Sequence, residues 1–156
     1  MDNYRQNWLE NKGFNTKDAL FLIENSPLVK SYFEVLALQE KGFEVKKDQL
    51  LKLLKDPNTF TDTKREIVFQ LHNVPYDQAK EFYQTVVQSN DLKVRQALVQ
   101  VVSEIPAEFM EDYKKFLNDN SYITREIVLK NLWLQNETGR AELLDKTATW
   151  KGFNDY

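Results

Sequence analysis

The side chains in this sequence that could most readily take part in catalysis or ligand binding are a single histidine and three evenly spaced arginines. His72 is the one histidine, and the chain has no cysteine. A zinc site of the H-E-x-x-H type needs two imidazoles one turn apart on a helix, so this sequence cannot form one. It also contains no P-loop, no G-x-G-x-x-G run and no G-x-S-x-G elbow. We therefore predict no catalytic residue, no metal ligand and no cofactor in this chain, and that the chain itself is not an enzyme.

Paired carboxylates are the remaining catalytic option. Acidic neighbours such as Glu111 and Asp112 fit a general acid–base mechanism by residue type. The surrounding pattern of charged and apolar residues is typical of a solvated helix face, which is the interpretation we favour.

The arginines recur with a spacing of 30 residues, at Arg65, Arg95 and Arg125. A guanidinium binds a carboxylate through two parallel hydrogen bonds, so the three could hold the carboxylate of a peptide. A repeated basic position in stacked helices can equally pair with acids of the neighbouring repeats. The available acids are Asp62, Asp91 and Asp119. We favour this inter-repeat ladder, and the peptide contact stays open.

The helices that position the arginines repeat with them. The middle copy carries apolar residues at i, i+3, i+4, i+7, i+8 and i+11, at Val94, Ala97, Leu98, Val101, Val102 and Ile105. This spacing is one face of a helix. At a period of 30, His72 aligns with Val102 and Leu132, which predicts a histidine tucked between helices with its hydrogen bond satisfied.

A second helix follows each first helix. Apolar positions 30 residues apart mark it, namely Ala79, Tyr83 and Val86 in one copy and Phe109, Tyr113 and Phe116 in the next. Pro75 and Pro106 separate the two helices of each copy, because proline ends one helix and is tolerated in the first turn of another.

The predicted fold is therefore all-α, with about ten helices in five antiparallel pairs and a repeat period of about 30 residues. The first pair is expected over residues 3–24. Glycine and proline number four each, which disfavours sandwiches and barrels with frequent turns. We expect residues 1–156 to form a single domain, an α–α superhelix of stacked repeats.

Charge and hydropathy exclude two kinds of partner. The net charge is −3, whereas nucleic-acid binding needs a basic surface to replace counterions. The apolar runs are too short to span a membrane. The compartment stays unknown.

Aromatic residues near the C-terminus form a candidate docking surface at Trp133, Trp150 and Phe153. Trp133 aligns with Ser103 and Asn73 on the polar side of their helices. A tryptophan there would be exposed on an isolated domain. We expect it to be covered by a following segment or another domain, or by the tail folding back.

The run DNSYITREIVLKNLW at residues 119–133 resembles the C-terminal helical region of aminopeptidase N-type (gluzincin) zinc metallopeptidases of the Bacteroidetes type. Residues 144–147 (LDKT) and 151–155 (KGFND) share this resemblance. It covers roughly residues 56–156, and the first 55 residues fit by architecture alone. The basic residue early in each first helix also resembles HEAT repeats.

This resemblance implies a non-catalytic HEAT-like α-solenoid at the C-terminal end of a larger chain. In that family a catalytic domain binds zinc and removes N-terminal residues from peptides, while the solenoid covers the active site and limits peptide access. The implied partners are the catalytic domain of the same chain and its peptide substrate, and the zinc belongs to that domain. The alternative is a free-standing HEAT-repeat scaffold for another protein, which predicts a polar capping helix at each end. A HEAT-like nucleic-acid binder is disfavoured by the acidic balance.

Overall fold

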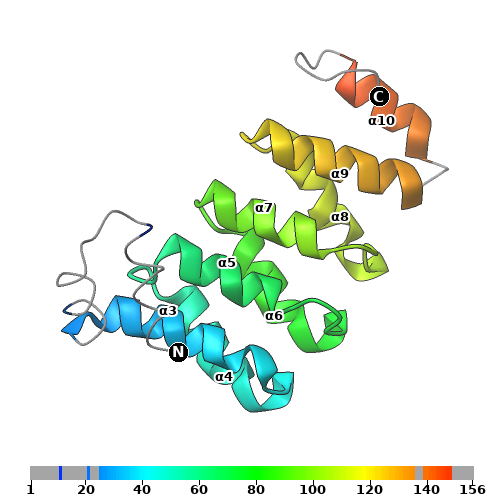
Figure 1. The fold of residues 1–156 in the computed structure, drawn as a ribbon. Coiled ribbons are helices and arrows are strands. Elements are labelled where there is room, and N and C mark those ends of the chain that lie inside the picture. The colour runs from blue at the N-terminus through cyan, green and yellow to red at the C-terminus, as the bar shows by residue number, and fades with distance from the viewer. Residues whose placement is uncertain (1–10, 12–20, 22–24, 136–138, 149–156) are drawn as a thin grey trace. The chain divides into compact units, whose positions relative to one another are not determined.

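The computed structural model describes residues 11, 21, 25–135 and 139–148, and all regular secondary structure in them is helical (Figure 1). This confirms the all-α prediction. The pair expected over residues 3–24 lies outside the described residues apart from Asn11 and Phe21, so the count of ten helices stays a prediction. The chain divides into two compact units, residues 1–70 and 71–156. The single domain over 1–156 likewise stays a prediction.

In the described part of the first unit, α3 covers Pro27–Ala37 and continues into the short 3-10 helix η1, Leu38–Glu40. The Ser26 side chain accepts a hydrogen bond from the Val29 backbone N–H at 3.3 Å, and Pro27 occupies the first turn. Both features favour a helix start here, since serine caps exposed N–H groups and proline needs no N–H partner in that turn. The helix buries one face, made of Val29, Tyr32, Phe33 and Val35.

Two further described helices follow in this unit, α4 at Phe43–Lys55 and α5 at Thr61–Phe69, and α5 packs against both α3 and α4. The α4 helix buries Leu50 and Leu54, and also Lys46, which is only 5% exposed. The Lys46 ammonium donates to the Leu38 carbonyl at 2.9 Å. Burial lowers the pKa of Lys46, because a low-dielectric surrounding disfavours its charged form.

The second unit contains α6 (Tyr76–Val87), α7 (Leu92–Val101), α8 (Met110–Lys114), α9 (Tyr122–Gln135) and α10 (Arg140–Thr147). The 3-10 helices η2 (Ala107–Phe109) and η3 (Lys115–Asn118) flank α8. The α9 helix packs against α7, α8 and α10. Aromatic rings line the core in a chain of mostly edge-to-face contacts, through Tyr76, Tyr83, Phe109, Tyr113 and Phe116.

The first helices of the repeats share a register that the 30-residue alignment misses by one residue. The helices α5, α7 and α9 begin at Thr61, Leu92 and Tyr122, so the first step is 31 residues and the second is 30. With this offset the same four positions, counted from the start of each helix, are buried in every copy, and the fourth lies just past the end of α5 and of α7. They are Thr63, Ile67, Val68 and Leu71, then Val94, Leu98, Val99 and Val102, then Thr124, Val128, Leu129 and Leu132.

The irregularity lies in the turn between the two helices of a repeat. Leu71 and Ala79 are eight positions apart, whereas the equivalent Val102 and Phe109 are seven apart. Helices must keep their buried face, but a surface turn tolerates an extra residue. The Asn73 backbone has a φ of 64° in that longer turn, a left-handed conformation that asparagine tolerates better than most residues.

The prediction of a core-facing His72 is wrong for this reason. His72 is exposed, and Leu71 occupies the buried position equivalent to Val102 and Leu132. One residue along an α-helix corresponds to a rotation of about 100°, so a shift of one moves a side chain to another face. The true register partners of Trp133 are consequently His72 and Ser103.

None of the helices in the described ranges combines the length and apolar character needed to cross a membrane.

Candidate functional site

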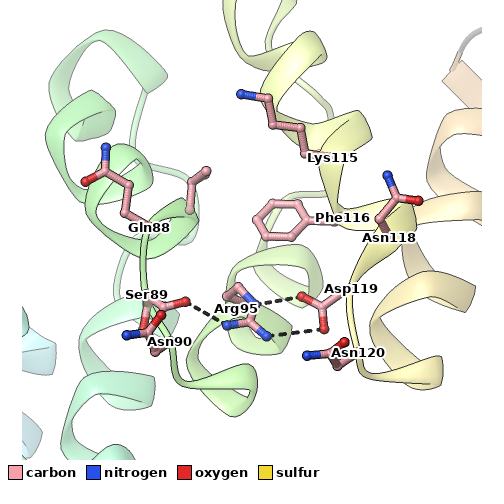
Figure 2. Close-up of a pocket in the computed structure, with 10 residues that line it drawn as sticks. Gln88, Ser89, Asn90, Arg95, Lys115, Phe116, Asn118, Asp119 and Asn120 are labelled. Atoms are coloured by element: carbon pink, nitrogen blue, oxygen red, sulfur yellow. Dashed lines mark hydrogen bonds and ion pairs between the residues drawn. The ribbon is translucent and has the colours of Figure 1, made fainter.

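An open pocket in the second unit lies where two consecutive repeats meet, and Figure 2 shows its lining. One wall is the end of α6 and the loop after it, with Gln88, Ser89 and Asn90. The opposite wall is η3 and the loop before α9, from Lys115 to Asn120. The cavity volume is about 320 Å³.

A buried ion pair crosses the base of this pocket. Arg95 Nε donates to Asp119 Oδ2 at 2.7 Å, and Arg95 Nη2 lies 3.5 Å from Asp119 Oδ1 (Figure 2). The Asp119 side chain is only 2% exposed and that of Arg95 is 14% exposed. A guanidinium engaged by two of its nitrogens with one carboxylate is held in a fixed plane. The pair joins α7 to the loop before α9, that is, one repeat to the next.

The two loops that flank the pocket use the same local hydrogen bonds. Arg95 Nη1 donates to the Ser89 carbonyl at 2.6 Å, and Arg125 Nε donates to the Asp119 carbonyl. The Ser89 hydroxyl accepts from the Asp91 backbone N–H at 3.1 Å, as Asp119 Oδ1 accepts from the Ser121 N–H at 2.9 Å. Ser89 and Asp119 are thus equivalent residues that turn the chain into α7 and α9.

Arg65 does not share this arrangement. It is the fifth residue of α5, whereas Arg95 and Arg125 are the fourth residues of their helices. Its Nη1 lies 3.9 Å from Asp62 of the same helix, and its guanidinium lies 5.5 Å from the centre of the Phe69 ring. The three predicted arginines therefore have different surroundings, and one of them, Arg95, joins two repeats through an acid side chain. The peptide-carboxylate contact stays a prediction.

Four carboxamides surround the pocket, on Gln88, Asn90, Asn118 and Asn120. All four residues are exposed, and none has a side-chain hydrogen bond to another described residue. Lys115 at the rim pairs with Asp112 at 3.0 Å. Since Arg95 is neutralised by Asp119, the pocket offers mainly uncharged donors and acceptors.

A second polar cluster lies in the second unit, where the half-buried Asn131 of α9 meets the buried Tyr113 of α8. Asn131 Nδ2 donates to the Tyr113 hydroxyl at 2.7 Å and lies 3.5 Å from the Val102 carbonyl. Burial raises the pKa of Tyr113 to about 12, and the Asn131 hydrogen bond opposes the shift only in part. In the first unit Gln70 occupies the position equivalent to Asn131, and its Nε2 donates to the Val35 carbonyl at 2.7 Å.

The predicted docking residue Trp133 is half-buried rather than exposed. Arg140 of α10 donates from Nε to the Trp133 carbonyl at 2.9 Å, and its guanidinium lies 5.0 Å from the centre of a Trp133 ring. A guanidinium over an indole face gains a cation–π attraction. Trp150 and Phe153 lie outside the described residues.

Sequence reasoning did not find the amide-lined pocket, although a signal was present. Gln88 and Asn118 are 30 residues apart, as are Asn90 and Asn120.

Comparison with family models, curated proteins and solved structures gives no match for this chain.

Proposed function

We propose that this chain is the non-catalytic C-terminal α-solenoid domain of a zinc metallo-aminopeptidase. In this role it packs on the catalytic domain and limits the access of peptides to the active site. The observation that carries the proposal is the run at residues 119–133, which resembles the corresponding region of that family and which forms α9 with its preceding loop.

The repeated register of the first helices supports the solenoid part of the proposal. Within the second unit, α7 and α9 pack against each other and bury the same four positions counted from the helix start, as expected when successive helices stack in the same way. Polar contacts also connect sequence-adjacent repeats, since Arg95 pairs with Asp119 and Asn131 approaches the Val102 carbonyl. Contacts between neighbouring repeats are the principal stabilising contacts in such proteins.

Several residues of the run at 119–133 have structural roles in this chain. Asp119 and Arg125 organise the loop before α9, and Val128 and Leu132 are buried in the core. The resemblance therefore concerns residues that position α9. It assigns no catalytic or zinc-binding residue to this chain. In the proposed parent protein, the catalytic domain binds the zinc and carries out peptide hydrolysis.

Trp133, Trp150 and Phe153 are the residues we assign to docking on the catalytic domain. The half-buried Trp133 ring already contacts Arg140, so docking would cover a surface that α10 has partly ordered. An aromatic ring with one covered face is a suitable interface anchor, because little side-chain entropy is lost on association.

The test begins with the open reading frame upstream of Met1. A continuous frame that encodes H-E-x-x-H and a downstream glutamate supports the proposal. The parent protein, with and without the segment 1–156, is then assayed on an aminoacyl anilide and on long peptides. Loss of discrimination between the two substrate lengths on deletion is the expected result. A stop codon directly before Met1 with no such motif nearby contradicts the proposal.

The alternative is a free-standing HEAT-repeat scaffold for another protein. It is favoured by the exposed apolar side chains of Tyr122 and Ile123 at the start of α9. Exposed apolar side chains next to a loop are suited to contact with a protein partner.

A further inference from the structure

We propose that the pocket lined by Gln88, Asn90, Asn118 and Asn120 binds the main chain of a peptide in extended conformation. The inference concerns the loops of this chain alone and does not depend on the proposed catalytic parent. It rests on the chemistry of the four amides, on their repeat spacing and on the apolar side chains beside them.

The chemistry of the lining matches a peptide bond. A carboxamide carries a carbonyl acceptor and two N–H donors, and a peptide bond carries one donor and one acceptor. The four amides are exposed and make no side-chain hydrogen bond to another described residue, so their capacity is available to a ligand. The charged groups nearby are paired internally, Arg95 with Asp119 and Lys115 with Asp112. An uncharged ligand therefore fits better than an anion or a cation.

The spacing of the amides matches an extended chain. Gln88 and Asn90 follow α6, whereas of their equivalents Asn118 is the last residue of η3 and Asn120 follows it. Packed helices lie about 8–10 Å apart. An extended chain rises about 3.3 Å per residue, so equivalent amides of neighbouring repeats face peptide groups about three residues apart.

The apolar side chains next to the amides suit the side chains of a peptide. Leu92 and Tyr122 are the first residues of α7 and α9, and they are 43% and 59% exposed. In each loop an amide, Asn90 or Asn120, thus precedes an exposed apolar side chain by two positions. Phe116 lines the pocket but is buried, so it offers little open ring face on which a sugar could stack.

The pocket is small and open, which predicts weak binding of a short segment. Its volume of about 320 Å³ is at the lower end of ligand sites, which span roughly 300–1,000 Å³. The fixed base formed by Arg95 and Asp119 keeps the two loops in place, so little ordering accompanies binding.

The experiment is a titration of the isotope-labelled chain, followed through the side-chain NH₂ signals in NMR spectra. The probe is the blocked peptide N-acetyl-Leu-Ala-Leu-Ala-amide. The matched control probe has the same sequence with N-methylated peptide bonds, which removes the main-chain donors. Maltotriose serves as the carbohydrate probe. We expect saturable shifts of the four amides with the first peptide and none with the other two.

Variants locate the contact. Asn90→Ala and Asn120→Ala are each expected to weaken binding by about fivefold, the effect of losing one hydrogen bond. Gln78→Ala changes an exposed amide of α6 outside the pocket lining and is expected to leave the affinity unchanged. If a variant fails to fold, the comparison of the two peptide probes on the wild-type chain still decides.

Three outcomes overturn the proposal. Equal shifts with the N-methylated peptide would show that main-chain donors are not recognised. Shifts with maltotriose alone would assign the pocket to carbohydrate. The absence of shifts with every probe would show that the amides are only hydrated.

Discussion

Arg65 of the first unit and Arg95 of the second belong to the same series of arginines spaced 30 residues apart, yet they make different contacts. Arg95 reaches a buried carboxylate in the next repeat, at 2.7 Å from Asp119. Arg65 lies 3.9 Å from Asp62 in its own helix, and both side chains are partly exposed. The difference follows from one residue of offset in helix register, which turns Arg65 to another face of α5. Sequence spacing alone therefore does not make two residues equivalent.

Replacing each arginine in turn tests whether Arg65 and Arg95 contribute differently to stability. Arg95→Ala leaves the buried Asp119 carboxylate without its counter-charge, which is expected to cost about 3–5 kcal/mol of unfolding free energy. Arg65→Ala removes a partly exposed contact and is expected to cost less than about 1 kcal/mol. Urea unfolding followed by circular dichroism measures both. Equal losses in the two variants would show that the two arginines are equivalent after all.

Alkaline pH should affect the two units in opposite directions. In the second unit the folded-state pKa of Tyr113 is raised to about 12 from its ordinary value near 10. This stabilising contribution is complete below pH 10 and is lost as the pH rises through 12, at about 1.4 kcal/mol per pKa unit. In the first unit the folded-state pKa of Lys46 is lowered from 10.5, so folding becomes more favourable as the pH rises toward that value.

Two variants separate these effects. Tyr113→Phe should remove the late phenolate step from an ultraviolet absorbance titration and reduce the loss of stability above pH 10. Lys46→Met should remove the gain in stability on the approach to pH 10.5. An unchanged titration in Tyr113→Phe would mean that another tyrosine carries the late step.

The amide side chains of α5 and α9 allow a milder comparison. Asn131→Ala removes the partner of the buried Tyr113 hydroxyl and is expected to cost about 2 kcal/mol. Gln70→Ala removes one hydrogen bond to the Val35 carbonyl and is expected to cost about 1 kcal/mol. The loss is partly offset because Gln70 Oε1 is buried with no partner in the described part of the chain. Thermal unfolding measures the order of the two losses. A larger loss for Gln70→Ala would reverse the inferred ranking of the two contacts.

The smallest expected change in stability comes from replacing a buried threonine, and it should be the same in both units. Thr63 and Thr124 are fully buried, and their hydroxyls have no hydrogen-bond partner among the described residues. The equivalent position in α7 is Val94, which shows that a methyl group fits there. Thr63→Val and Thr124→Val are each expected to raise the unfolding free energy by up to about 1 kcal/mol. A loss of stability in either variant would reveal a hydrogen bond of that hydroxyl.

The helical class and the core of the second unit could be predicted from the sequence. The period of apolar residues in α7 identified its buried face through Val94, Ala97 and Leu98, which are all buried. The predicted face extended too far, because α7 ends at the half-buried Val101 and Ile105 lies beyond the helix. The second helices were aligned correctly, since Ala79 and Phe109, and likewise Tyr83 and Tyr113, are buried pairs. Local periodicity suffices for such assignments, because each helix carries its own pattern.

The candidate site was predicted only in part. Arg95 and Asp119 were both named, but neither their pairing nor the absence of an equivalent contact for Arg65 followed from spacing. His72 was placed in the core, although the longer turn after α5 brings Leu71 to that position. An extra residue in a turn leaves the apolar pattern within each helix unchanged, so the sequence hides the offset between helices.

The sequence by itself determined that this chain is helical and that it lacks a histidine pair for zinc. Those properties depend on composition and on spacings within single helices, where 3.6 residues per turn relate sequence to face. The tertiary structure alone decided which arginine meets which acid, that Tyr113 and Asn131 share a buried hydrogen bond, and that four amides surround one pocket. Those contacts join residues 18 or more positions apart or lie on separate loops, so they depend on how the helices pack against one another.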